Sequence, residues 1–350
     1  MQTNTYTFRS EFPFELENGY VFNQITLSYT IIGNVELLST NSVWICHGLT
    51  ANQNPSDWWK EQVGQGLTFD PNKEVVICVN VPGSSYGSVS PLSINEYTGQ
   101  PYYHQFPDWT IRDVVNAFEL LKNHLNIQVI NKLVGASVGG MIALQWAAIN
   151  NATANQLILI ATNAAHSPWG KAFNVSQRMA LEADASFYSG TVQGGQKGLA
   201  AARSIAMLSY RTERSYLQTQ YDFNKVVPDE SRASGYQRYQ GKKMVDRFNA
   251  HCYYSLTKLM DSHDIATQQH LREEVLSTIT IPTLIVGIDT DVLFPIHEQY
   301  YLFEHLPNAF FGKIVSQYGH DAFLIEHLQL TNILQHFFNE QHHEYLITAT

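Results

Sequence analysis

Short runs of apolar residues recur along the chain, and amphipathic or polar segments separate them. The runs are continuous rather than alternating, as is typical of strands that are covered on both faces of a sheet. We predict strands at five of these runs, residues 42–48, 74–81, 131–137, 155–162 and 281–288.

The segment between the second and third runs predicts an amphipathic helix at residues 110–125. Its apolar side chains recur every three or four positions and therefore share one stripe. They are Ile111, Val114, Val115, Phe118 and Leu121. Strands that alternate with such helices favour a mostly parallel sheet with right-handed crossovers. The predicted fold class is α/β, a mostly parallel sheet flanked by helices.

This alternation stops near residue 165 and resumes near residue 280. The segment between is rich in helix-forming stretches, among them "GLAAARSIAMLSY" and "FNAHCYYSLTKLMDSHD", and contains no convincing strand. We interpret residues 165–280 as an insertion that forms a helical cap, or lid, over a core made of residues 1–164 and 281–350. The tail from residue 339 onward is interpreted as a polar end.

Composition indicates a globular protein. The 350 residues are 44% hydrophobic and 12% aromatic, which is enough for a substantial core. No segment approaches the roughly 18 uncharged apolar residues of a membrane span, and the N-terminus lacks a signal-peptide pattern. The three cysteines, Cys46, Cys78 and Cys252, lie in mostly apolar surroundings and are expected as buried thiols of a reducing compartment. We therefore expect a cytoplasmic protein.

Charge and motif spacing limit the ligands that the chain is expected to bind. The formal net charge is -10 and the Lys and Arg residues are dispersed, so we expect neither a nucleic-acid partner nor a membrane partner. No His/Glu or Cys/His spacing indicates a metal site. No phosphate-binding loop motif is present either, and "GSSYGS" at residues 83–88 is most simply a loop.

Ser137 has the most informative local sequence. It lies in "GASVGG", after a predicted strand and before the helix-like stretch "VGGMIALQWAAI". Small neighbours permit a sharp strand-to-helix turn that strains the serine backbone and exposes its hydroxyl above the carboxyl end of a sheet. Because G-x-S-x-G also occurs in ordinary loops, the flanking strand and helix carry the hypothesis that Ser137 is a nucleophile.

A serine nucleophile needs a base, and the base needs an orienting carboxylate. His320 lies in a glycine-flanked loop near the C-terminus, and Asp291 lies just beyond the strand at 281–288. The order Ser137, Asp291, His320 is the order used by α/β-hydrolases. Asp289 competes for the role of the acid. We prefer Asp291 because it lies farther beyond the strand, whereas Asp289 suits a turn-stabilising role.

Acyl transfer through a serine also needs hydrogen-bond donors for the oxyanion. "CHGLTAN" at residues 46–52 follows the first core strand, where loop amides can face the nucleophile. The backbone amides of Leu49 and Val138 are the candidates. The alternative for His47 and Gly48 is a plain tight turn.

Longer stretches resemble one family over nearly the whole chain, the homoserine O-acetyltransferases of the α/β-hydrolase superfamily. The resemblance rests on "CHGLTANQNPSDWW", residues 79–121, "GASVGGMIALQWA", "GLAAARSIAMLSYR", "DSHDIA", "VGIDTDVLFP" and "YGHDAFLIE". The segment 79–121 and the "YGHDAF" loop are far more specific than the turn around Ser137.

The resemblance implies transfer of an acetyl group from acetyl-CoA, a co-substrate, to the hydroxyl of L-homoserine in methionine biosynthesis, with no permanently bound cofactor. It also implies a homodimer formed through the cap and a tunnel between cap and sheet. The matching residues are Ser137, Asp291 and His320 as a catalytic triad, and Arg203 and Asp321 as substrate contacts.

The chain departs from the common family pattern at Ala136, Val138, Gly48 and Ala51, where the family commonly has G-G-S-M-G-G and H-A-L-T-G. These side chains shape the pocket but leave the triad and the backbone amides unchanged. Some relatives use succinyl-CoA as the acyl donor, and others acylate serine instead of homoserine. A different donor and a different acceptor are therefore alternatives for this chain. A carboxylesterase with the same triad is a further alternative, and a non-catalytic ligand-binding member of the fold would usually lack a triad residue.

Overall fold

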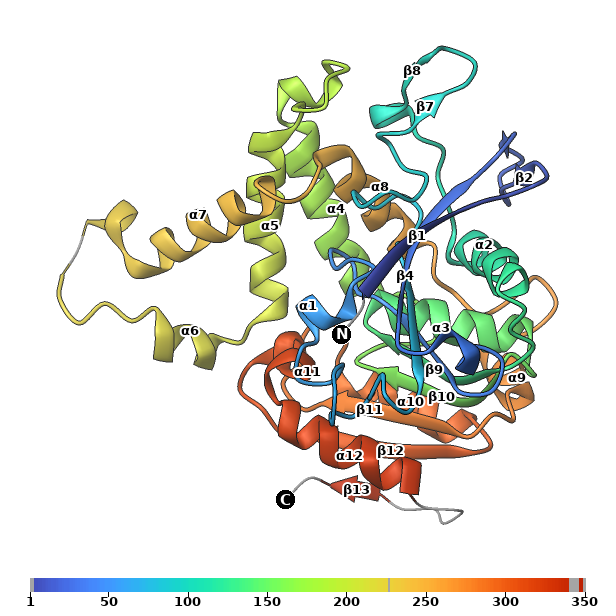
Figure 1. Ribbon diagram of the computed structural model, residues 1–350. Coiled ribbons are helices and arrows are strands. Elements are labelled where there is room, and N and C mark those ends of the chain that lie inside the picture. The colour runs from blue at the N-terminus through green and yellow to red at the C-terminus, as the bar shows by residue number, and fades with distance from the viewer. Residues whose placement is uncertain (1–2, 226, 340–345, 349–350) are drawn as a thin grey trace.

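A nine-stranded sheet forms the centre of the computed structural model, which describes residues 3–225, 227–339 and 346–348 (Figure 1). Its strands from β6 to β13 run parallel, whereas β1 and β4 add an antiparallel edge. In spatial order they are β1 (Thr3–Arg9), β4 (Thr26–Ile32), β6 (Val75–Val79), β5 (Ser42–Cys46), β9 (Ile130–Ala136), β10 (Ala154–Ile160), β11 (Thr283–Ile288), β12 (Ala309–Ile314) and β13 (Leu346–Thr348).

The structure confirms the predicted fold class. The five predicted strands correspond to β5, β6, β9, β10 and β11, with ends that differ by two residues or fewer. Residues 346–348 of the polar tail form a short strand that was not predicted, and this strand pairs with β12 at the parallel edge. The rest of the tail from residue 340 lies outside the described residues.

Helices cover both faces of the sheet. Successive strand residues such as Trp44 and Ile45 point into separate hydrophobic cores, one on each face. One core is closed by α2 (Ile111–His124), α3 (Val138–Ile149), α9 (Arg272–Thr278) and α10 (Ile296–His305). The other is closed mainly by α11 (Ala322–Ile325) and α12 (His327–Asn339). The parallel strands are therefore apolar on both sides, which explains their continuous apolar runs.

The segment between β10 and β11, which we interpret as the cap, contains several α-helices besides α9, whose Leu276 lies in the core. They are α4 (Pro168–Glu182), α5 (Gln196–Tyr210), α6 (Glu213–Thr219), α7 (Arg232–Val245) and α8 (Ala250–Asp261). An isolated antiparallel bridge between Ala165 and Asp264 joins the two ends of this segment at a narrow neck. In Figure 1, α4, α5 and α8 stand against the core, whereas α6 and α7 project away from it.

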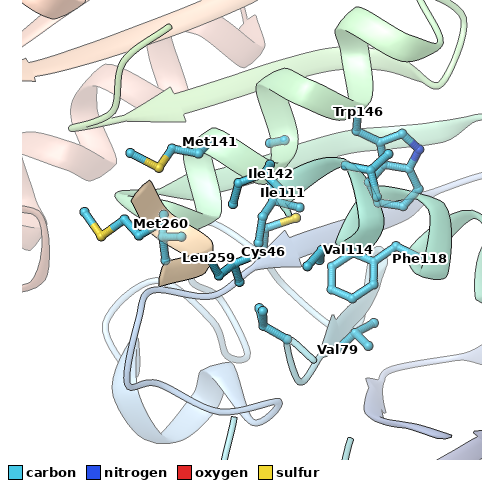
Figure 2. Close-up of a cluster of buried hydrophobic side chains, with 14 of the residues drawn as sticks. Cys46, Val79, Ile111, Val114, Phe118, Met141, Ile142, Trp146, Leu259 and Met260 are labelled. Carbon is cyan, nitrogen blue, oxygen red and sulfur yellow. The ribbon is translucent and has the colours of Figure 1, made fainter. Parts of the chain in front are cut away.

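The last cap helix is tied to the hydrophobic core. Figure 2 shows Leu259 and Met260 of α8 beside Ile111 of α2 and Ile142 of α3, all of which are buried. The amide of Ile111, the first residue of α2, also donates a hydrogen bond of 3.1 Å to Ser262 Oγ. This end of the cap is thus packed as firmly as the core itself.

The described residues contain no helix that is both long and apolar enough to cross a membrane. The three cysteines are free and buried, as their apolar surroundings predicted. Burial raises the pKa of each thiol, and that of Cys252 to about 12, so none of them is a thiolate near neutral pH.

Candidate active site

Ser137 occupies a strained turn between β9 and α3. Its φ of 58° and ψ of -128° are rare for a residue with a side chain and cost about 1–3 kcal/mol. Packing forces the turn, because a Cβ at Gly135 would lie 2.1 Å from the carbonyl oxygen of Gly139. A Cβ at Gly139 would lie 2.0 Å from the carbonyl oxygen of Cys46. Only glycine permits the first turn of α3 to approach β9 and β5 this closely.

The structure brings Ser137, His320 and Asp291 together. Ser137 Oγ lies 2.9 Å from His320 Nε2, and His320 Nδ1 lies 2.6 Å from Asp291 Oδ2. Because a carboxylate accepts, Nδ1 carries the proton and Nε2 is free to accept one from the serine. Asp291 Oδ1 accepts from the amides of Leu293 and Phe294 at 2.8 and 2.9 Å, which fixes the carboxylate.

Asp289 has a different task. Its Oδ1 accepts a hydrogen bond of 2.9 Å from the amide of Ser316, in the segment that follows β12. It therefore joins the ends of two adjacent strands, as a turn-stabilising carboxylate does. No hydrogen bond connects Asp289 to His320 among the described residues.

The ring of His320 is enclosed by aromatic side chains. Phe294 stacks on it with a centroid distance of 5.1 Å, and Tyr210 and Phe323 lie at 5.7 and 5.6 Å. Burial opposes the charged imidazolium, but the charge and hydrogen bond of Asp291, with a smaller contribution from Asp321, outweigh it. The net result is a His320 pKa raised above the ordinary value of 6.5.

His47 holds the loop that carries Leu49. The amide of Val81 donates to His47 Nε2 at 3.0 Å, so the proton lies on Nδ1, which is 2.8 Å from the carbonyl oxygen of Gly48. Burial lowers the pKa of His47 to about 4 and keeps the ring neutral. Since the peptide is trans, the Leu49 N–H points away from that carbonyl.

The amides of Leu49 and Val138 donate to no other group within the described ranges. Leu49 lies in the turn after β5, and Val138 is the first residue of α3, directly after the candidate nucleophile. Unpaired amides at a helix N-terminus and in an adjacent loop can stabilise a negative oxygen. Both candidates are thus available as oxyanion donors.

Asp321 is adjacent to His320 in the chain, and Arg203 is connected to the ring of His320 through Tyr210. The Arg203 guanidinium is 5.2 Å from the ring centroid of Tyr210, which itself contacts His320, and it has no carboxylate partner in the described chain. Asp321 Oδ2 lies 2.9 Å from Arg211 Nε in an ion pair, although this N–H is not aligned for a hydrogen bond.

Arg211 was missed by reasoning from the sequence. It lies directly after α5 and ends the quoted stretch "GLAAARSIAMLSYR", but a helix-terminal arginine is an ordinary feature. Only the fold brings it to Asp321. No cluster of three or more His, Cys, Asp or Glu side chains suited to a metal ion occurs within the described residues.

Comparison with known proteins follows this geometry. The family profile of the α/β hydrolase fold matches residues 41–326. The homoserine O-acetyltransferase of Cyclobacterium marinum is 42% identical over 325 residues, covering 93% of this chain and 92% of the relative. The chain belongs to the homoserine O-acetyltransferase family of α/β hydrolases. It is therefore an enzyme of the acyltransferase class. The homoserine O-acetyltransferase of Chloroherpeton thalassium is 38% identical over 93% of this chain and 86% of its own length.

Solved structures share this architecture. A homoserine O-acetyltransferase from Staphylococcus aureus superposes with a TM-score of 0.81 at 28% identity and covers 98% of each chain. Esterase E22 superposes with a TM-score of 0.86 at 19% identity, over 97% of this chain and all of its own. This second likeness shows the fold alone, so the backbone does not separate the homoserine O-acetyltransferase family from esterases.

The two aspartates predict different mutant phenotypes. We expect Asp291→Asn to slow acylation of Ser137 by p-nitrophenyl acetate by about 10⁴-fold, because an asparagine favours the wrong tautomer of His320. Asp289→Asn is the matched control and retains most of the rate, since it contacts only a strand end. Stopped-flow release of p-nitrophenolate from both folded variants measures this. A larger loss in Asp289→Asn contradicts the assignment.

Proposed function

We propose that this chain is an acetyl-CoA-dependent L-homoserine O-acetyltransferase with Ser137 as nucleophile, His320 as base and Asp291 as orienting acid. The observation that carries the proposal is the pair of hydrogen bonds of 2.6 and 2.9 Å that join Asp291, His320 and Ser137. Membership in the family supports the choice of acetyl group and acceptor. The product would serve methionine biosynthesis.

The first half-reaction acetylates the enzyme. His320 Nε2 takes the proton of Ser137 Oγ as this oxygen attacks the thioester carbonyl of acetyl-CoA. The amides of Leu49 and Val138 bind the tetrahedral oxyanion, and Asp291 stabilises the imidazolium. The carbon–sulfur bond breaks, the coenzyme A sulfur takes the proton from His320, and acetyl-Ser137 remains.

The second half-reaction moves the acetyl group to the amino acid. His320 takes the proton of the homoserine hydroxyl, whose oxygen attacks acetyl-Ser137 through the same oxyanion site. Ser137 leaves as its oxygen regains the proton, and O-acetylhomoserine departs. This sequence is a ping-pong mechanism. The cap limits the access of water, which would otherwise hydrolyse the acyl-enzyme.

Arg203 and Asp321 supply charges that suit a zwitterionic acceptor. Arg203 has no carboxylate partner among the described residues, so its guanidinium is available to the carboxylate of homoserine. Asp321 engages Arg211 through Oδ2 only, which leaves Oδ1 for the ammonium group. A partly dry pocket strengthens both contacts because charge-assisted hydrogen bonds are strongest there.

We also propose a cytoplasmic homodimer that forms through the cap. Large apolar or aromatic side chains on and around α5, α6 and α7 are more than half exposed, and such clusters mark interaction surfaces. They are Leu208, Leu217, Tyr221, Phe223 and Tyr239. The projection of α6 and α7 from the core makes them accessible to a second copy (Figure 1). The free, buried cysteines support a reducing compartment.

The covalent intermediate gives the first test of this mechanism. Acetyl-CoA without acceptor should add one acetyl group to Ser137, and Ser137→Ala should abolish the adduct. Intact-protein and peptide mass spectrometry detect both. Stoichiometric acetylation of another residue, or transfer that persists in Ser137→Ala, rules the nucleophile out. Thiol release from acetyl-CoA and succinyl-CoA, with and without homoserine or serine, separates the alternative donors, acceptors and plain hydrolysis.

The acceptor contacts predict a selective defect. Loss of one charge-assisted partner costs about 1.5–3 kcal/mol, so Arg203→Ala and Asp321→Asn should each lower transfer to homoserine roughly 10- to 150-fold. Acetylation of Ser137 should change much less. Lys197→Ala, an exposed change on the same helix as Arg203, is the control. Single-turnover measurement of each half-reaction decides the matter, and equal losses in both contradict acceptor recognition.

The raised pKa of His320 predicts an acid limb in the rate profile. The neutral imidazole is the base, so kcat/KM for acetyl-CoA should fall as pH drops through an apparent pKa above 6.5. Asp291→Asn removes the charge that raises this pKa and should move the limb to lower pH. Initial rates across pH 5 to 9 test this expectation, which an unshifted limb in the variant contradicts.

A further inference from the structure

Arg247 connects the cap to the loop beside the nucleophile. It follows α7, and its Nη1 donates to the carbonyl oxygen of Thr50 at 2.6 Å and to Tyr86 Oη at 3.1 Å. Its Nη2 donates to Thr50 Oγ1 at 3.1 Å. Tyr86 Oη in turn donates to the Arg247 carbonyl oxygen at 3.3 Å. One cap side chain thus grips Thr50 through both its backbone and its hydroxyl.

Thr50 belongs to the turn that presents the Leu49 amide. The amide of Ala51 donates to the carbonyl oxygen of Gly48 at 3.1 Å, which closes a four-residue turn with Leu49 and Thr50 at its centre. The core holds the first residue of this turn through His47. Within the described ranges, the side chain and carbonyl of Thr50 are hydrogen-bonded only by Arg247.

Arg247 is itself held in a fixed place. The next residue, Phe248, is buried and packs edge-on against Tyr86 with a centroid distance of 5.6 Å. The amide of Asn249 donates to Ser85 Oγ at 3.0 Å, and α8, which begins at Ala250, is packed into the core. The exposed Arg247 side chain therefore extends from a backbone segment that the residues after it anchor to the core.

We propose that Arg247 is a positioning residue for acyl transfer, which sets the place of the Leu49 amide by holding the turn 48–51 to the cap. This inference rests on the proposed role of that amide as an oxyanion donor. The oxyanion forms in both half-reactions, so loss of Arg247 slows both. Arg203 and Asp321, by contrast, are proposed to act mainly on the acceptor.

Three variants test the proposal against a matched control. Loss of an oxyanion donor costs about 10²- to 10³-fold in kcat, and a misplaced donor should cost part of that, about 10- to 100-fold. We expect this loss in Arg247→Ala, a smaller one in Arg247→Lys, and the smallest in Tyr86→Phe, which removes one contact. Arg238→Ala, an exposed ion-pair change on α7, should match the wild type.

The measurements distinguish a positioning role of Arg247 from a role in binding the acetyl donor, acetyl-CoA, and from a general loss of folding. Acetylation of Ser137 is measured with acetyl-CoA and with p-nitrophenyl acetate, which has no phosphates, and deacetylation is measured with homoserine. We expect both half-reactions to slow with KM little changed. Affinity for a trifluoromethyl ketone, which forms a tetrahedral oxyanion on the serine, should weaken in parallel with kcat.

Other outcomes overturn the inference. If only the KM for acetyl-CoA rises and reaction with p-nitrophenyl acetate is unaffected, Arg247 binds acetyl-CoA and is not a positioning residue. The inference is also rejected if Arg247→Ala folds and keeps wild-type rates. If Arg247→Ala does not fold, wild-type affinity for the ketone in both Arg247→Lys and Tyr86→Phe rejects it. If the wild type itself forms no acetyl-Ser137 from either donor, the proposed function has failed instead.

Discussion

The close approach of α3 to the ends of β5 and β9 is the constraint on which the site depends. Any side chain at Gly139 would meet the carbonyl oxygen of Cys46 at about half of a normal contact distance. With glycine there, the strained serine, the first helical amide and the loop after β5 converge on one point. Ser137 keeps its strained backbone conformation because the close packing of α3 against β5 and β9 allows no relaxed one.

Burial lowers the pKa of both His47 and His320, and the groups beside each ring decide whether its final pKa is lowered or raised. His47 is buried beside a carbonyl and an amide, so burial lowers its pKa to about 4. The ring stays neutral and is held by these two hydrogen bonds. His320 is buried beside the Asp291 carboxylate, and the pKa is raised instead. Near neutral pH the site therefore holds one titratable ring, that of His320 beside Ser137, and one ring that stays neutral, that of His47 beneath the loop that carries Leu49.

The sequence predicts those parts of the molecule whose signals are local. Continuous apolar runs locate five parallel strands, and small residues around Ser137 locate the turn. Strands β1, β4, β12 and β13 of the central sheet were not predicted, since their identity depends on pairing with neighbours rather than on a long apolar run. Asp289 and Asp291 lie two positions apart, and only the fold shows which carboxylate meets His320.

Contacts between distant segments account for the rest. Arg211 reaches Asp321, and Arg247 reaches Thr50 across 197 positions of sequence. Neither arginine differs from a surface helix residue in its local pattern. A single sequence does not report which of its dispersed cations will face the site, because that depends on how the cap folds back over the sheet.

The bridge between Ala165 and Asp264 bears on how much the length of the inserted helical segment can change. The chain that leaves for α4 at Ala165 and the chain that returns from α8 at Asp264 are paired neighbours, so the two ends of this helical segment lie together. Closing a longer loop adds entropy cost only logarithmically, so residues added to or lost from the projecting helices α6 and α7 (Figure 1) strain the core little, whereas α8 is part of the core packing. The projecting part of the cap can therefore change in length while Ser137, His320 and Asp291 keep their places at the ends of the strands.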